Sequence, residues 1–355
     1  MKPIQLPPDA RVLVVAMRRL GDVLLTTPLI RSVKRAFPTA SIEALVFAGT
    51  EEILSGNPDL ATVATVSERP SLGESLALLG RLARRYDLAL STQTGDRPTA
   101  LAVFAGRQSA GPIEGGGLSA GIKRFALSRS YATDRARHRI TDLLRLAELL
   151  GIAPSAEIVC PSGNVRSGLI PTHAYAVVHA VPKFTYKRWN AQGWRGLAAE
   201  LRRRGLATMV IGAKADRGYL DDLWRGCDVV RLDGTLSWPE LSALIGAARV
   251  YIGPDTAVTH LAAATGTQTV ALYGPTDPRI WGPWPVGGLE RPWAAAGTIQ
   301  NRGNVWLVQN PLPCLPCQEE GCERHIDSYS RCLDELSAVQ VVAAVDHALA
   351  VRQAA

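Results

Sequence analysis

The sequence predicts an α/β protein built from two doubly wound parallel-sheet domains. Three observations support this. Short, uniformly apolar strands alternate with helical patterns, the second half of the chain repeats the scheme of the first, and a segment rich in Pro, Gly and Ser lies between the halves. Strands without polar alternation are typical of a parallel sheet covered on both faces. The 355 residues, 47% of them hydrophobic, suffice for two cores.

The first half opens with an apolar strand at residues 11–17. The helical pattern that follows predicts a helix at 28–37, with Thr27 as a suitable N-cap and Pro28 as the first helical residue, although a start at Asp22 is also compatible with the pattern. The next predicted elements are a strand at 41–47, a helix at 75–86 and a strand at 87–92. A phosphate loop follows a strand and carries a lysine after its glycines. The Gly-rich residues 111–117 have neither a predicted strand before them nor a lysine directly after them, so we expect a surface loop there.

The second half repeats this alternation. Its predicted strands lie at 175–180, 207–213, 228–232, 249–253 and 269–274, and its predicted helices at 193–205, 216–226, 237–248 and 257–266. Residues 160–173 have the composition of a linker, and a final helix is predicted at 337–353. We therefore expect an N-terminal domain at 1–165, a C-terminal domain at 172–335 and a terminal helix at 336–355, with the two domains facing a central cleft.

Charge and composition limit the classes of function. The formal net charge of +7 favours anionic partners. No apolar run of about 18 residues occurs, so no membrane span is predicted. The first apolar strand is short and is followed at once by Arg18 and Arg19, so no signal peptide is predicted either. The pattern favours a cytoplasmic protein with reduced thiols. Neither G-x-G-x-x-G nor a Walker loop is present, which argues against nicotinamide enzymes and P-loop NTPases.

Two segments of the second half predict an anion site. Asp255 and Thr256 lie between a strand end and a helix start, where unpaired backbone N–H groups attract diphosphate, and His260 follows one turn later. The alternative is that Thr256 only caps the helix and His260 is an ordinary buried histidine. A basic loop with Lys183 and Lys187 follows the strand at 175–180, again at the carboxyl edge where open α/β sheets bind ligands.

Asp22 is the candidate general base. It follows the first strand on a loop bent at Gly21, which should point its carboxylate into the cleft and toward the anion site of the second domain. Transfer of a sugar from a nucleotide needs such a base for the acceptor hydroxyl, together with stabilisation of the leaving diphosphate. The alternative is that Asp22 is a plain helix N-cap.

These segments resemble the heptosyltransferases of glycosyltransferase family 9. The resemblance runs in order through RVLVVAMRRLGDVLLTTPLIRSVKRAFPTASIEALVF, HAVPKFTYKRWN and GPDTAVTHLAAATGTQTVALYGPTDPRIWGP. It implies a GT-B architecture of two Rossmann-like domains, ADP-heptose as donor and the phosphorylated inner core of lipopolysaccharide, carried on lipid A, as acceptor. It further implies an inverting reaction without metal or other cofactor, peripheral work at the inner face of the cytoplasmic membrane, and no nucleic-acid partner.

The resemblance assigns residues as well. Asp22 matches the family's catalytic aspartate and Lys187 the lysine at the donor's phosphates, with Thr185 beside it. Ala257, where the first two heptosyltransferases of the pathway carry glycine, is more like the third, branch-adding enzyme. The remaining donor-site matches are Asp255, Thr256 and His260.

Two arginines next to the proposed base are expected to meet the acceptor. Arg18 and Arg19 stand where the first enzyme of the pathway has small polar residues. Guanidinium groups bind phosphate well, so we predict that both contact phosphates of the acceptor.

Four cysteines form a separate candidate site. Cys314, Cys317, Cys322 and Cys332 follow the spacing C-x2-C-x4-C-x9-C. Four thiolates can close a tetrahedral zinc or iron site, and the resemblance includes protein-modifying heptosyltransferases in which similar clusters hold iron. A structural zinc or iron ion is one interpretation, and four reduced thiols are the other.

Two other functions compete with heptose transfer to lipopolysaccharide. The same fold could transfer a different ADP-sugar onto another glycan or a protein. A nucleic-acid-binding protein with a cysteine-held metal would also use the positive charge. However, basic and aromatic residues do not alternate here as they do in stacking platforms, which disfavours the latter.

Overall fold

The computed structural model describes residues 3–353. Residues 1–2 of the predicted N-terminal domain and residues 354–355 of the predicted terminal helix lie outside the described residues. The chain forms two compact units, one ending at Pro161 and the other beginning at Ser162. This boundary lies inside the segment 160–173. Among the described residues, none of the helices combines the length and the apolar character needed to cross a membrane.

The first unit is a six-stranded parallel sheet in the order β3-β2-β1-β4-β5-β6, the doubly wound order of nucleotide-binding folds. Its strands are β1 (Arg11–Ala16), β2 (Ser41–Phe47), β3 (Thr62–Val66), β4 (Tyr86–Ser91), β5 (Gly106–Ile113) and β6 (Arg129–Ala132). Its α-helices are α1 (Leu20–Leu24), α2 (Thr27–Ala36), α3 (Leu72–Leu82), α4 (Asp96–Ala105), α5 (Leu118–Ala126) and α6 (Arg139–Leu150), with a 3₁₀ turn at Glu51–Leu54.

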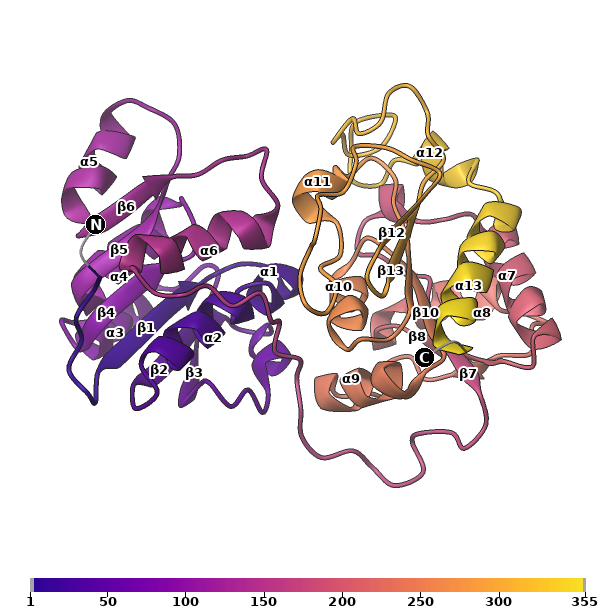
Figure 1. Ribbon diagram of the computed structural model, residues 1–355, viewed down its shortest axis with the longest axis horizontal. Helices are drawn as coiled ribbons and strands as arrows, with labels where there is room; N and C mark the ends of the chain where they lie inside the picture. The colour runs from indigo at the N-terminus through magenta and orange to yellow at the C-terminus, as the bar shows by residue number, and fades with distance from the viewer. Residues whose placement is uncertain (1–2, 354–355) are drawn as a thin grey trace. The chain divides into compact units, whose positions relative to one another are not determined.

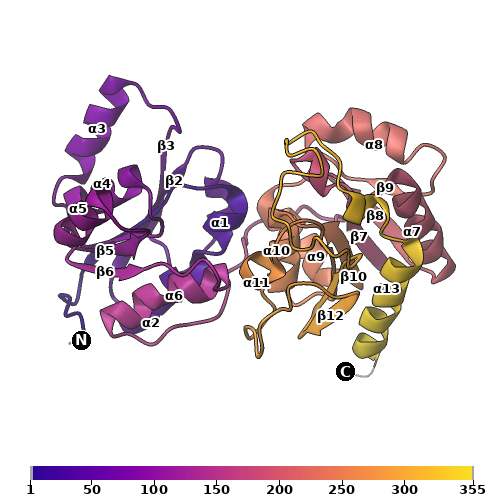
Figure 2. The ribbon, with the colours of Figure 1, turned by 90° about the horizontal axis from the view of Figure 1, so that it is seen from above.

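Helices cover both faces of this sheet, as the apolar strands predict (Figure 1, Figure 2). Successive residues of β1 alternate between two cores. Val12 and Val14 pack with α2 and α6, whereas Leu13 and Val15 pack with residues of α3 and α4. Burial on both faces explains why β1 carries no polar residue after the exposed Arg11 at its start.

The second unit repeats the plan with seven strands in the order β12-β13-β11-β10-β7-β8-β9, parallel except for β12. Its strands are β7 (Tyr175–His179), β8 (Ala207–Ile211), β9 (Val230–Arg231), β10 (Val250–Pro254), β11 (Thr269–Leu272), β12 (Ile299–Arg302) and β13 (Val305–Val308). Its α-helices are α7 (Ala191–Arg203), α8 (Arg217–Leu223), α9 (Trp238–Ala247), α10 (Ala257–Ala264), α11 (Pro278–Trp281), α12 (Arg331–Asp334) and α13 (Ala338–Gln353). Two 3₁₀ turns, η2 and η3, span Thr185–Lys187 and Lys214–Asp216.

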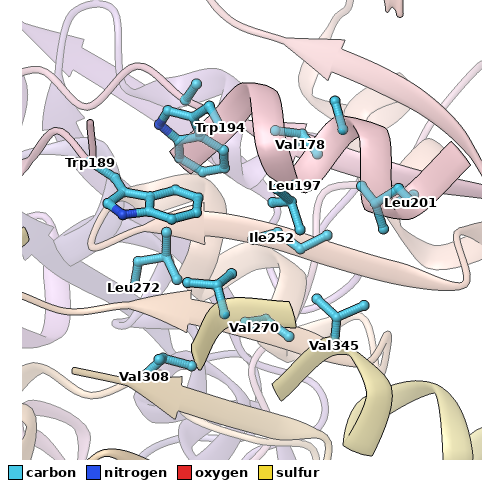
Figure 3. Packing of buried hydrophobic residues seen from close by; sticks show 14 of the residues in the cluster. Val178, Trp189, Trp194, Leu197, Leu201, Ile252, Val270, Leu272, Val308 and Val345 are labelled. Carbon is cyan, nitrogen blue, oxygen red and sulfur yellow. The ribbon is translucent and has the colours of Figure 1, made fainter. Parts of the chain in front are cut away.

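The larger core of this unit contains two tryptophans packed edge to face, Trp189 and Trp194, with ring centroids 4.9 Å apart (Figure 3). The terminal helix α13 belongs to the same core, where Val341 and Val345 pack against α7 and the sheet. The sequence pattern left its packing partner open. The structure places it on the second unit.

Some helix starts differ from those predicted. Helix α3 begins at Leu72 rather than at residue 75, because Ser71 and Glu74 form a capping box ahead of the apolar pattern. Helix α2 is capped at Thr26 instead of Thr27 and follows directly on the short α1.

The Gly-rich segment 111–117 is only partly a loop. Residues 111–113 form the end of β5, where a Cβ on Gly111 would lie 3.1 Å from that of Ser91. This close approach of neighbouring strands is the structural reason for a glycine there.

Both sheets have a topological switch point, between β1 and β4 in the first unit and between β7 and β10 in the second. At such a point the connections leave in opposite directions and open a crevice outside the carboxyl ends of the strands. The segments that follow these four strands therefore define where each unit is built to hold a ligand.

Candidate active site

The first candidate site lies at the switch point of the first unit and centres on Asp22. The carboxylate is in the first turn of α1, just after β1, and its side chain is 11% exposed. Arg18 Nε lies 3.1 Å from Asp22 Oδ1, and Arg139 Nε lies 3.9 Å from the same oxygen. Two guanidinium groups thus face one carboxylate oxygen.

The interpretation of Asp22 as a helix N-cap is wrong. Arg19 is the N-cap of α1, with extended backbone, and Asp22 is the third residue of the helix. Thr26 donates its hydroxyl hydrogen bond to the backbone carbonyl of Asp22 at 2.9 Å, not to the carboxylate. Asp22 Oδ1 is buried without a hydrogen bond of good geometry, so its carboxylate is free of a structural capping role.

Sequence analysis missed Arg139. This residue begins α6, more than a hundred positions after Asp22, and only the sheet topology brings the two together. Burial lowers the pKa of the Arg139 guanidinium, and the nearby Asp22 charge opposes that shift. The segment RARHRI is basic, but no sequence pattern indicates which of its arginines turns inward.

The two predicted acceptor arginines differ in their surroundings. Arg18 is partly exposed and paired with Asp22. Arg19 is exposed, and its backbone carbonyl accepts the N–H of Val23 at 3.1 Å, which starts α1. Both lie at the edge of the sheet next to Asp22, and their contact with an acceptor stays a prediction.

The second candidate site lies at the switch point of the second unit. Lys187, on the loop after β7, forms an ion pair with Asp255, which follows β10. Thr276 also donates to Asp255 Oδ2, at 2.7 Å. Sequence analysis missed Thr276, which lies in the loop after β11. The structure therefore brings together three loops that follow β7, β10 and β11.

Asp255 is a charged anchor. Its burial alone would raise its pKa, but the charges of Lys187 and His260 and the hydrogen bonds from Lys187 and Thr276 outweigh burial and lower it. Asp255 therefore holds Lys187 in place at the sheet edge. An ammonium group fixed in this way is pre-positioned for an anion.

Thr256 contacts a histidine that sequence analysis also missed. Thr256 is the N-cap residue of α10 by position, yet its side chain makes no capping hydrogen bond. Its Oγ1 lies 3.3 Å from Nδ1 of His179, the last residue of β7. Burial lowers the pKa of His179 to about 4, so this imidazole is neutral at pH 7. His260 is buried one turn into α10, close enough to Asp255 to interact with its charge.

The remaining residue predicted for the donor site, Thr185, begins the 3₁₀ turn η2 that ends at Lys187. The two aromatic side chains around it, Phe184 and Tyr186, stack with centroids 5.5 Å apart. Lys183 is exposed on the same loop, and Lys187 lies over the face of Tyr186 at 5.9 Å.

The four cysteines are close together but do not form a ligand set. Cys332 is buried, whereas Cys314, Cys317 and Cys322 are exposed. Burial, and then the charges of the other three, raise the pKa of Cys332 to about 12. Within residues 3–353, no group of three or more His, Cys, Asp or Glu side chains is arranged to hold a metal ion.

Comparison with known proteins identifies the family. The model of glycosyltransferase family 9 (heptosyltransferase) matches residues 76–288, more than half of the chain. Lipopolysaccharide heptosyltransferase 3 of Escherichia coli is 30% identical over 291 residues, which cover 76% of this chain and 83% of that protein.

Solved structures agree on the fold. The E. coli ADP-heptose lipopolysaccharide heptosyltransferase II superposes with a TM-score of 0.73 at 17% identity, covering 97% of this chain and 99% of the other. The iron-containing glycosyltransferase TibC of enterotoxigenic E. coli gives a TM-score of 0.59 at 16% identity, covering 98% and 78%. The two parallel-dominated sheets are thus of the GT-B class, and the chain belongs to glycosyltransferase family 9, the heptosyltransferases.

Proposed function

We propose that this protein transfers heptose from ADP-heptose onto the phosphorylated inner core of lipopolysaccharide, with inversion and without a metal in the chemical step. The observation that carries the proposal is the position of two groups. A carboxylate without a structural hydrogen bond, Asp22, and a fixed ammonium group, Lys187, each lie at the switch point of a doubly wound sheet. Base and leaving-group stabiliser are the two functions that such a transfer needs.

In the proposed reaction the first unit binds the acceptor and the second unit binds the donor. Asp22 takes the proton of the acceptor hydroxyl as its oxygen attacks the anomeric carbon. The bond to the diphosphate breaks on the opposite face, which inverts the configuration. Lys187 and the N-terminal end of α10 stabilise the negative charge that develops on the departing ADP.

Arg18 and Arg19 are proposed to bind the acceptor's phosphates. Arg18 is 45% exposed, so its pair with Asp22 can be exchanged for a phosphate that offers two or more oxygens. The exchange would free Asp22 from one cation at the moment when the acceptor is bound.

The test is the substitution Asp22→Asn. We expect kcat to fall by a factor on the order of 10² to 10⁴, with ADP affinity unchanged, because the amide keeps the shape but cannot accept the proton. Asp96→Asn is the matched control, since Asp96 also lies in the first turn of a helix of this unit but is exposed and paired with Lys123.

Product masses from assays with ADP-heptose, other ADP-sugars and truncated core acceptors identify the substrates in the same experiment. Full activity of Asp22→Asn would refute the proposed base. Transfer from another ADP-sugar alone would refute the proposed donor.

We also propose that the protein works at the inner face of the cytoplasmic membrane and meets it through α5. Three apolar side chains one helical turn apart point to solvent: Leu118 is 83%, Ile122 59% and Phe125 94% exposed. The helix carries Lys123 and Arg124 and no acidic residue. Exposed apolar groups flanked by basic ones are typical of helices that lie on acidic lipid surfaces.

Finally, we propose that Cys314, Cys317, Cys322 and Cys332 take up a structural zinc or iron ion. The spacing and the closeness of the sulfurs support this, as does the iron in the structurally similar TibC. The three exposed cysteines would have to close around the ion over the buried Cys332. Metal analysis of the purified protein tests the proposal, and a metal-free protein that folds normally contradicts it.

A further inference from the structure

We propose that Arg139 is a positioning residue for the transfer reaction, which holds the Asp22 carboxylate in place while Arg18 is exchanged for the acceptor's phosphate. This inference rests on the proposed role of Asp22 as base. It assigns different tasks to the two guanidinium groups that face the same oxygen.

The two arginines differ in burial. The side chain of Arg18 is 45% exposed, whereas that of Arg139 is 15% exposed. A solvated ion pair is weak and readily exchanged, but a buried one is screened much less. Arg18 is therefore the partner that a phosphate can displace, and Arg139 is the partner that stays.

Arg139 is also tied to the sheet. Its Nη2 donates to the backbone carbonyl of Thr92 at 2.7 Å, directly after β4. Thr92 in turn donates both its N–H, at 3.1 Å, and its hydroxyl, at 2.9 Å, to the carbonyl of Val15 in β1. The Arg139 guanidinium thus connects the Asp22 carboxylate to Thr92, which is itself hydrogen-bonded to β1. Because β1 and β4 are central strands, this anchor is rigid.

The other charged groups around Arg139 have partners of their own. Asp142, one turn further along α6, lies 3.1 Å from Arg145 and accepts the hydroxyl of Thr133 at 2.6 Å. Tyr131 of β6 donates to the backbone carbonyl of Asp142 at 2.8 Å. The charge that Arg139 balances most closely is therefore that of Asp22.

The need for such a residue follows from the burial of Asp22. Its Oδ1 is buried and has no hydrogen bond of good geometry. A buried charge is stable only when it is paired. When Arg18 turns to the acceptor, Arg139 is the cation that remains paired with Asp22.

The experiment compares Arg139→Gln with Arg145→Gln, which removes a cation from the same helix but from a different carboxylate. We expect Arg139→Gln to lower kcat about tenfold or more by misplacing the base. We also expect it to move the acidic limb of the kcat profile upward by about one pH unit. Donor KM should not change, and Arg145→Gln should leave the acidic limb in place.

Arg139→Lys keeps the charge but cannot reach both Asp22 and the Thr92 carbonyl in the same way. It should retain the acidic limb of the parent protein while losing a few-fold in kcat. This variant also provides the test if Arg139→Gln does not fold, and an unchanged kcat of Arg139→Lys would then overturn the proposal.

A double-mutant cycle separates this proposal from that of the base itself. If Arg139 acts through Asp22, then Arg139→Gln adds no further loss of kcat in the Asp22→Asn protein. Multiplicative losses, or an acidic limb that does not move, would overturn the role of Arg139 while leaving the base intact. Full activity of Asp22→Asn would instead overturn the base, and the role of Arg139 with it.

Discussion

His179 ends β7 at the switch point of the second unit, and its burial makes protein stability depend on acid pH. Its pKa is about 4 in the folded protein, against an ordinary value of 6.5. Between these values the unfolded chain binds the proton and the folded protein does not, so stability is lost as pH falls from 6.5 toward 4. The difference corresponds to ~3 kcal/mol of folding free energy over the whole window.

We expect thermal unfolding to move to lower temperature between pH 7 and pH 4.5, and His179→Asn to flatten this dependence. Asparagine keeps a polar atom near the position of Nδ1, which contacts Thr256 at 3.3 Å, but it does not titrate. His173→Asn is the control, because His173 is exposed in the segment before β7. An equal pH dependence in the His179 variant and the parent protein would contradict the prediction.

At the residue scale, the sequence indicated the polar groups that follow strands but not those brought in from elsewhere. Asp22, Lys187 and Asp255 were found because each lies in the segment that follows an apolar strand, at the carboxyl edge of its sheet. Arg139 begins a helix, and Thr276 follows β11 by a few residues in a turn-rich loop. Their roles depend on side-chain direction, which periodicity does not encode.

At the scale of elements, α5 stands out because it exposes its large apolar side chains to solvent instead of burying them. Its Ala120 packs against the sheet, yet its large apolar side chains face solvent. We expect Leu118→Ser, Ile122→Ser and Phe125→Ser together to reduce sedimentation with vesicles rich in anionic phospholipid by about tenfold or more, since each buried CH₂ contributes ~0.8 kcal/mol. Co-sedimentation with vesicles at physiological salt measures this loss of membrane binding.

Helix α3 supplies the matched control for this test. Leu72 and Leu76 are also one turn apart and exposed, but they lie on another helix of the same unit. Their replacement by serine should leave vesicle binding as it is. If the α3 variant loses as much binding as the α5 variant, or if neutral vesicles bind equally well, the assignment of α5 as the membrane-facing helix is wrong.

A local capping box sets the start of α3, and a tertiary contact sets its end. The capping box of Ser71 and Glu74 was visible in the sequence and starts α3 at Leu72, ahead of the helix predicted from residue 75. At the other end, Arg84 takes a positive φ of 48°, so the chain turns away before the predicted end at residue 86. Tertiary contacts, not helix preference, set that stop, because Arg84 donates its N–H to the carbonyl of Phe104 at 3.1 Å.

At the scale of the whole molecule, the alternation of strands and helices was enough to predict the fold class. The order of the strands places both switch points where the motifs lie. The hairpin of β12 and β13 was not predicted. It adds an antiparallel edge strand to the second sheet, and its strands are only four residues long, too short for a clear pattern.

The assignment of donor and acceptor to different units leads to a last prediction. If ADP binds the second unit, its addition should slow hydrogen exchange in segments 183–188 and 255–261, which follow β7 and β10, and leave residues 17–25 unchanged. Lys187→Ala should weaken this protection about tenfold or more, since it removes the cation at the diphosphate.

Lys187→Ala should also destabilise the second unit by roughly 2–3 kcal/mol, because Asp255 then stays buried with less compensation. Lys183→Ala is the control for both effects, since Lys183 lies on the same loop but is exposed. Hydrogen exchange resolved by peptide measures both the protection by ADP and the stability of the second unit in one experiment. Protection confined to the segment around Asp22 would reverse the assignment of the two units, and protection unaffected by Lys187→Ala would remove this lysine from the donor site.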